Sequence, residues 1–199
     1  MTAKIKLNAA SGGGSFSLQA PSSSANTRVM TLPDTADGTI LTTTNPATGN
    51  VVQTVNAVHS TQVETSDGSV VDTGLTADIT LTYSDSKVLI FVTQPLMTQQ
   101  YNNTGDADCA LILTRVTSGS STNIFNSSAV LTSCRTSGEG SGSWFVRSAN
   151  LASIVSEDTP GAGTHTYKTR LKHNSRSSTS SRTCDNSHPA EIILMEVAA

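Results

Sequence analysis

Aromatic and charged side chains are scarce in this chain of 199 residues, at 4% and 14% of the sequence. The charged fraction lies well below the roughly 25% of an average globular protein. The formal net charge of -3 argues against a protein that binds nucleic acid through phosphate contacts. No segment approaches the ~20 apolar residues of a membrane-spanning helix, and no apolar core follows Lys4 and Lys6 as it would in a secretory signal peptide. We therefore expect no nucleic-acid partner, no membrane insertion and no signal peptide.

Cysteine is also rare, with three residues at wide spacing, Cys109, Cys134 and Cys184. An odd and widely spaced set excludes a disulfide-dense secreted scaffold, and it lacks the spacing of a structural zinc site. We expect buried free thiols, and a single Cys134–Cys184 bridge is the alternative.

Small hydroxyl side chains are abundant, with 29 Ser and 30 Thr. Thr is β-branched and suits a half-buried pleated surface, whereas Ser competes with the helical backbone and favours turns. The composition therefore predicts strands and loops, and only a weak helical pattern is present, around residues 151–157.

The composition changes near Asn50, which suggests two parts. Before it, apolar residues are sparse between polar runs such as SGGGS at 11–15, PSSS at 21–24 and LTTT at 41–44. Such a ribbon cannot offset its ordering entropy alone, so its partners must come from another chain or from another part of an assembly. We predict an extended N-terminal arm over residues 1–50 that takes part in oligomerisation, and a separate domain over residues 51–199.

Clear strand patterns begin after the arm. Residues 76–83 (TADITLTY) alternate between apolar and polar side chains, and residues 87–93 (KVLIFVT) and 110–116 (ALILTRV) are short apolar runs. The first pattern is typical of a half-buried strand and the other two of strands deep in a core. About ten such segments are separated by turn residues, which predicts an all-β fold: the extended arm followed by an antiparallel β-sandwich, specifically a jelly roll.

Residue patterns for catalysis or for metal binding are absent. Serines and four histidines are available, but no serine lies in a G-x-S-x-G turn, and the carboxylates have no spacing that would indicate a glycosidase pair. Asp106 and Asp108 lack the further ligands of a calcium loop, and no helix follows the glycine-rich segment at 138–142 to bind phosphate. We therefore expect no enzymatic activity, no metal and no cofactor.

One basic cluster stands out, formed by Lys168, Arg170 and Lys172, which alternate along a predicted strand and so share a face. It could bind anionic glycans, for example the phosphates and acids of a bacterial envelope, with Trp144 stacking on a sugar. The alternatives are a solvated strand edge protected by charge, and a tryptophan that anchors the core.

Two stretches resemble segments of fibre proteins of tailed bacteriophages. The first combines a glycine-rich start at 12–14 with SLQAP at 17–21, VMTLPD at 29–34 and DGTIL at 37–41, and it resembles an N-terminal motif recurrent in those proteins. The second is similar to a C-terminal β-domain common in phage fibres and contains, in order, DTGL at 72–75, SKVL at 86–89, LTR at 113–115, TYKTRL at 166–171 and IILMEV at 192–197.

The resemblance implies a trimeric virion protein, made in the host cytoplasm and carried on the surface of a phage particle. Its arm would bind other virion proteins and its jelly roll would face outward, in contact with a host surface glycan. No extended shaft separates the two parts, so a short tail, neck or head fibre and a capsid decoration protein without a receptor role both stay open. The candidates for apolar contacts within the assembled arm are Phe16, Leu18, Met30, Leu32, Ile40 and Leu41.

Overall fold

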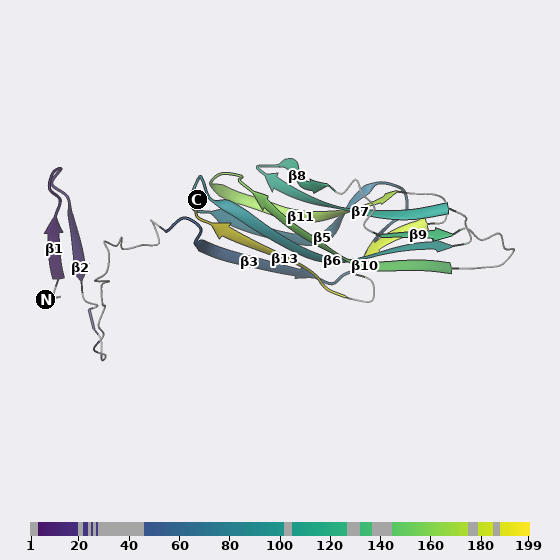
Figure 1. The fold of residues 1–199 in the computed structure, drawn as a ribbon, viewed down its shortest axis with the longest axis horizontal. Helices are drawn as coiled ribbons and strands as arrows, with labels where there is room; N and C mark the ends of the chain where they lie inside the picture. The colour runs from purple at the N-terminus through teal and green to yellow at the C-terminus, as the bar shows by residue number, and fades with distance from the viewer. Residues whose placement is uncertain are drawn as a thin grey trace. The chain divides into compact units, whose positions relative to one another are not determined.

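The computed structural model describes residues 4–19, 22–23, 25, 27, 46–101, 105–126, 132–136, 145–174, 179–184 and 188–199. The chain divides into two compact units, Met1–Ile40 and Leu41–Ala199, which are described separately below. Every regular element in the described ranges is a β-strand (Figure 1). These ranges accordingly contain no helix of the length and apolarity that crossing a membrane requires.

The first unit contains a β-hairpin. β1 (Lys4–Asn8) pairs with β2 (Ser15–Gln19), and the register places Ile5 opposite Leu18 and Leu7 opposite Phe16. Directly opposed residues of an antiparallel pair share a face, so Ile5, Leu7 and Leu18 lie on one side of the ribbon, and all three are exposed. The other predicted arm contacts, Met30, Leu32, Ile40 and Leu41, lie outside the described residues.

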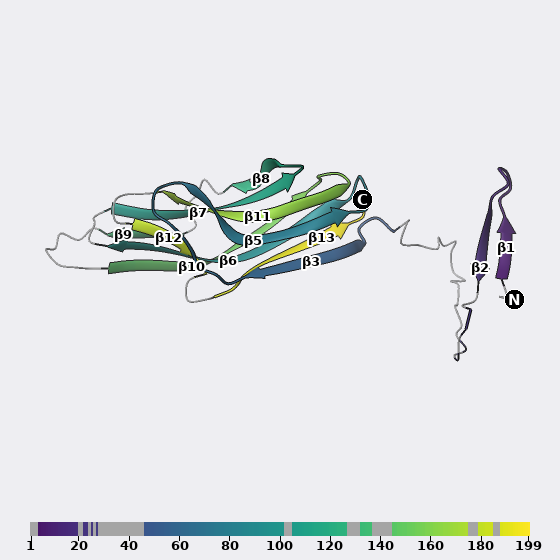
Figure 2. The same ribbon diagram turned by 180° about the vertical axis from the view of Figure 1, so that it is seen from behind.

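The second unit consists of two antiparallel sheets (Figures 1 and 2). The six-stranded sheet contains β3 (Val51–His59), β4 (Val63–Thr65), β6 (Lys87–Tyr101), β10 (Phe145–Asp158), β12 (Thr179–Thr183) and β13 (Ala190–Val197). The five-stranded sheet contains β5 (Val70–Leu81), β7 (Gly105–Thr117), β8 (Ser120–Asn126), β9 (Thr132–Thr136) and β11 (Gly163–Asn174).

The pairing pattern confirms the predicted antiparallel sandwich and identifies it as a jelly roll. Eight strands pair from the outside inward: β3 with β13, β5 with β11, β6 with β10, and β7 with β8. The further pairs β13–β6 and β11–β7 complete the four-strand orders β3-β13-β6-β10 and β5-β11-β7-β8. This order is that of one long hairpin folded over on itself, which is how a jelly roll distributes its strands between two sheets.

The central strands are longer than their apolar runs predict. β6 extends past residue 93 to Tyr101, and β7 begins at Gly105, five residues before its apolar run. β12 continues the ladder on β6 where β13 ends, and β9 pairs with β7 over Gly105–Cys109, before the segment paired with β8. Much of the segment between the two apolar runs is therefore strand, because neighbouring strands supply its backbone hydrogen bonds. The weak helical pattern near residue 151 lies within β10, for the same reason.

The core lies between the two sheets and is formed by alternate residues of the strands. Its apolar part includes Leu75, Ile79, Ile90, Leu111, Tyr167, Leu171, Ile192 and Leu194, all fully buried. Cys109 and Cys184 are free and buried, which agrees with the expected thiols and shows that the alternative Cys134–Cys184 bridge is wrong. Burial raises the pKa of Cys109 to about 12, against a weaker opposite effect of a hydrogen bond with Ser181.

Candidate binding surface

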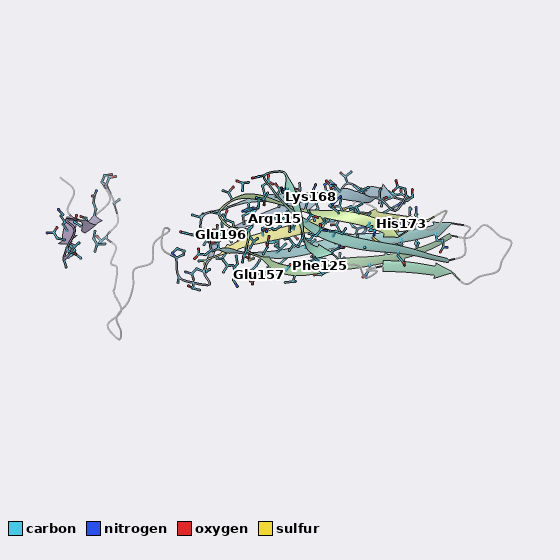
Figure 3. The ribbon with its side chains drawn as sticks, turned by 90° about the horizontal axis from the view of Figure 1, so that it is seen from above. Arg115, Phe125, Glu157, Lys168, His173 and Glu196 are labelled. Carbon is cyan, nitrogen blue, oxygen red and sulfur yellow. The ribbon has the colours of Figure 1, made fainter. Side chains whose placement is uncertain are left out.

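The predicted basic cluster lies on the outer face of the five-stranded sheet. Tyr167 and Thr169 of β11 are buried in the core, so Lys168, Arg170 and Lys172, which alternate with them, lie on the opposite face. Lys168 is labelled in Figure 3. Lys172 is exposed, whereas Lys168 and Arg170 are half-buried. The strand therefore brings the three cations to one surface.

Asp72 of the neighbouring strand β5 compensates two of these charges. Its Oδ2 atom lies 2.7 Å from Lys168 Nζ, and its Oδ1 atom lies 3.2 Å from Arg170 Nε. The carboxylate is half exposed, so each contact is screened by solvent and contributes little stability. Asp72 has a larger effect on the charge of the surface, since one carboxylate forms ion pairs with two of the three cations.

A hollow of about 340 Å³ opens beside these ion pairs, at an irregularity between β5 and β11. The register shifts between Lys168 and Arg170, opposite Gly74, whose φ of +86° suits a residue without a side chain. The lining residues are Asp72, Gly74, Leu75, Thr76, Val116, Thr166, Lys168 and Thr169. The hollow thus offers hydroxyl groups, an ammonium group and a carboxylate, a set that can hydrogen-bond a polar or anionic ligand such as a sugar.

Trp144, the predicted stacking residue, lies outside the described residues. Of the predicted glycan surface, the structure brings together Lys168, Arg170 and Lys172. Asp72 is the residue that sequence reasoning missed. It precedes Lys168 by 96 positions in the chain, and no sequence pattern indicates which strand pairs with β11.

A second hollow, of about 440 Å³, lies over β6 and β10 of the other sheet. Its lining is mostly apolar and consists of Pro95, Leu96, Met97, Ala149, Asn150, Leu151 and His188. It occurs where β13 leaves the edge of β6 and β12 takes its place. The change of neighbouring strand leaves room above the sheet that side chains fill only in part.

A buried Ser–His pair is present within the sandwich. Ser181 Oγ lies 2.7 Å from His173 Nδ1 and donates to the Asp108 carbonyl oxygen at 3.3 Å. Burial lowers the pKa of His173, although the nearby Asp108 opposes this effect. Both side chains are fully buried, so no substrate reaches the hydroxyl, and the pair serves packing.

A charged network joins the two sheets on the inner side of β7 and β10. Arg115 Nη1 contacts both carboxylate oxygens of Asp158, at 2.8 and 2.6 Å, and Tyr167 donates its hydroxyl to Asp158 Oδ2 at 2.8 Å. Burial raises the pKa of Tyr167, and the hydrogen bond to Asp158 raises it further. Each member is held by the others, which is typical of a structural cross-link between sheets. Across the described ranges, no three His, Cys, Asp or Glu side chains come together as a metal site would require.

Comparison with known proteins assigns the chain to no family. No protein-family model and no curated protein sequence matches the chain. One solved structure that matches in part is that of infectious bursal disease virus, Gx strain, with 12% sequence identity and a TM-score of 0.33. The match covers 97% of this chain and 46% of that one, so this chain spans less than half the length of the matched protein.

Proposed function

We propose that the chain is a virion structural protein of a tailed bacteriophage, a short fibre or knob that attaches through its N-terminal arm as a homotrimer. The order of the motifs in the arm and in the β-domain, as in phage fibre proteins, supports this assignment. The observation that carries it is the hairpin of β1 and β2, which exposes Ile5, Leu7 and Leu18 on one face.

A two-stranded ribbon is marginally stable by itself, and this one has no sheet or helix within the described part of its unit to cover the apolar face. Contact with other copies of the arm, or with another virion protein, would bury that face. The jelly-roll domain has a core of its own and would stand outside the anchored part, with the surface of Lys168, Arg170 and Lys172 directed to a host glycan.

A capsid decoration protein without a receptor role is the second candidate. The ion pairs of Asp72 with Lys168 and Arg170 favour it, because they reduce the positive charge available to an anionic glycan. Both candidates place the protein on the particle, and they differ in whether the β-domain binds the host.

Two measurements test the anchoring role. The mass of the assembled full chain in solution should be a multiple of three times the 20.6 kDa chain mass. A variant with Leu7→Lys and Leu18→Lys should lose this threefold association, whereas Lys6→Ala, on the other face of β1, should keep it. A monomer or dimer in the unchanged protein contradicts the trimer.

Occupancy on the particle tests attachment directly. Deletion of residues 1–44 should leave a folded β-domain that no longer decorates virions. Normal occupancy of the truncated protein would show that the arm is not the anchor.

Host contact is tested by binding of the purified protein to host cells and to their envelope polysaccharide. A receptor role predicts saturable binding that falls when Lys168 and Arg170 are both changed to Ala. Decoration of the particle without any host binding would favour the second candidate.

A further inference from the structure

The hollow of about 340 Å³ on the five-stranded sheet lies at a bulge of β5 against β11. The register pairs Lys168 with Thr76 and Arg170 with Asp72. Residues 73–75 of β5 therefore lie opposite a single residue of β11. A strand with extra residues bends away from its partner at that point. The hollow thus follows from the register of two paired strands.

Thr73 holds this bulge in a fixed shape. Its side chain is fully buried, and its hydroxyl accepts a hydrogen bond from the Leu75 amide and donates one to the Thr169 carbonyl oxygen, both at 3.2 Å. Gly74 provides the φ of +86° at the centre of the bulge. Bulges are frequent beside active sites, and a glycine within a strand often marks the close approach of a ligand.

The charges that line the hollow are balanced. Asp72 and Lys168 are the charged members of the lining, and their side chains are in contact at 2.7 Å. An anionic group bound to Lys168 inside the hollow would lie beside the Asp72 carboxylate, and a cation bound to Asp72 would lie beside the Lys168 ammonium. Like charges at such a separation repel each other. The lining therefore favours a ligand group without charge.

Both charged groups can bind a ligand without breaking their ion pair. An ammonium has three N–H donors, and Lys168 uses one of them for Asp72. A carboxylate has about four acceptor positions, and Asp72 uses two of them for Lys168 and Arg170. The Thr166 hydroxyl donates to Asp78 Oδ1 at 2.6 Å, so it faces a ligand as an acceptor. The hollow can thus donate hydrogen bonds to one ligand and accept others from it.

A sugar ring has the chemistry that this lining requires. Each of its hydroxyls both donates and accepts, so neighbouring hydroxyls can bind an ammonium and a carboxylate together. Its C–H groups form an apolar surface, and Val116 is the half-buried apolar residue of the lining. The volume is near the lower end of the range for small-molecule sites, roughly 300–1,000 Å³, which suits a single ring.

We propose that the hollow binds one uncharged hexose unit of a glycan, with neighbouring hydroxyls between Lys168 and Asp72 and ring carbons against Val116. This inference rests on the glycan contact in the proposed function and adds the kind of sugar to it. Arg170 and Lys172, which are not part of the lining, would contact acidic groups of the same glycan beside the hollow.

Saturation-transfer NMR on the full chain tests the kind of ligand. The probes are the methyl glycosides of glucose, galactose, mannose and N-acetylglucosamine, with methyl glucuronide as the charged counterpart. At least one neutral glycoside should bind with a dissociation constant in the millimolar range, and the glucuronide should bind more weakly. The neutral affinity should be equal at about 0.05 M and about 0.5 M NaCl, because salt screens charges only. No neutral binding, or tighter binding of the glucuronide, would overturn the proposal.

Filling the hollow tests the place of binding. Thr76→Phe puts a large side chain into the hollow from an exposed position of β5, where an aromatic residue suits a strand. Binding of the neutral glycoside should be lost. Thr80→Phe is the matched control, since Thr80 is also exposed on the same face of β5 but does not line the hollow. It should keep the binding, and both variants should keep the circular dichroism spectrum. Binding that survives Thr76→Phe, or that is lost in Thr80→Phe, would place the sugar elsewhere.

Asp72→Asn separates this inference from the proposed function. The variant should raise the dissociation constant of the neutral glycoside about tenfold, because hydrogen bonds to a charged acceptor are the stronger ones. Lys172→Ala, outside the hollow, should leave that constant unchanged. An unchanged constant in Asp72→Asn would overturn the inference. Neutral binding that behaves as expected, in a protein that does not bind host cells, would instead contradict the receptor role and leave the hollow as a sugar site.

Discussion

Thr169 of β11 donates a hydrogen bond to Gln94 Oε1 of β6 at 2.7 Å, and this bond joins the two sheets in the middle of the sandwich. Both side chains are fully buried. Further contacts lie on each side of this bond. Thr73 Oγ1 lies 2.5 Å from Thr169 Oγ1, and the Gln94 side-chain amide donates to Thr183 Oγ1. The abundance of threonine thus serves the interior of this domain as well as its surface.

Removal of the Thr169 hydroxyl tests the strength of this link. Thr169→Val keeps the shape of the side chain but leaves Gln94 Oε1 and the Thr73 hydroxyl without this partner, at a cost of about 1–3 kcal/mol in the free energy of unfolding. Urea titration measures this change. Thr164→Val is the control, since its hydroxyl pairs with Thr80 at the exposed surface, and its cost should stay within about 0.5 kcal/mol. Equal changes in the free energy of unfolding for the two variants would show that the buried bond stabilises the fold no more than the exposed one.

Gly74, which lines the hollow on β5, also allows the His59 side chain to approach its backbone. A Cβ atom at position 74 would lie 2.4 Å from His59 Nε2, and the φ of +86° disfavours a side chain as well. Gly119 has a similar φ of +81° with nothing within 4 Å of such an atom. Gly74→Ala should therefore destabilise more than Gly119→Ala, by about 1–3 kcal/mol in chemical denaturation.

The His59→Ala background separates the close approach from the backbone strain. If the imidazole causes the excess, Gly74→Ala in that background should cost about as much as Gly119→Ala. An excess that persists without the imidazole would assign the cost to the backbone alone.

The fold class could be predicted because alternation along each strand is a local property. Residues 76–83 show the polar and apolar faces of β5 directly, and the apolar run at 87–93 marks the start of β6. The continuation of β6 could not be predicted in this way, since Gln94, Thr98 and Gln100 face the core as polar residues. Their burial depends on partners from other strands, such as Thr169 and Thr183, which the sequence does not bring together.

The candidate surface was predictable only in part, for the same physical reason. Alternation places Lys168, Arg170 and Lys172 on one face of a strand, and the structure agrees. The charge of that surface depends on Asp72, which the pairing of β5 with β11 brings into contact. Pairing between distant strands is set by the whole sheet, so a local pattern holds no information on it.

Acid should weaken the domain partly through Glu196, which is fully buried on β13 (Figure 3). Gln53 Nε2 donates to one carboxylate oxygen at 2.5 Å, and the Thr82 amide donates to the other at 2.9 Å. Burial alone raises the pKa of Glu196, but these hydrogen bonds lower it below the usual value of 4.5. Because the folded pKa is the lower one, the stabilisation is present above pH 4.5 and is lost as the pH falls through the folded pKa.

Glu196→Gln should accordingly reduce the free energy of unfolding at pH 7 by about 1.5–3 kcal/mol, since it replaces hydrogen bonds to a charged group. The difference from the unchanged protein should shrink as the pH approaches 3. Glu191→Gln on the outer face of the same strand removes the charge from an acceptor that Asn56 contacts at the exposed surface, and it should have a smaller effect at pH 7. A difference that is constant with pH would show that the charge of Glu196 is not involved.

The two described thiols should be unreactive in the folded protein. Cys109 and Cys184 are fully buried, and the Cys184 thiol donates to the His59 carbonyl oxygen at 3.4 Å. In a Cys134→Ser background, a thiol reagent should label no cysteine before unfolding and two afterwards. Dithiothreitol should leave the melting temperature unchanged, and a fall in that temperature would indicate a disulfide between chains.

Asp72 offers the sharpest test of the candidate surface, because one carboxylate contacts two of its three cations. Asp72→Asn removes the counter-charge of Lys168 and Arg170 and keeps the side-chain volume. If the surface binds anionic glycans, the variant should need a higher salt concentration for elution from an anionic polysaccharide column.

Asp78→Asn is the matched control, because it changes the net charge equally. Asp78 lies on the same strand and accepts a hydrogen bond from Thr166 at 2.6 Å. Retention that rises for Asp72→Asn alone assigns the binding to Lys168 and Arg170. Equal rises for both variants would reflect net charge, and unchanged retention would remove these cations from the binding surface.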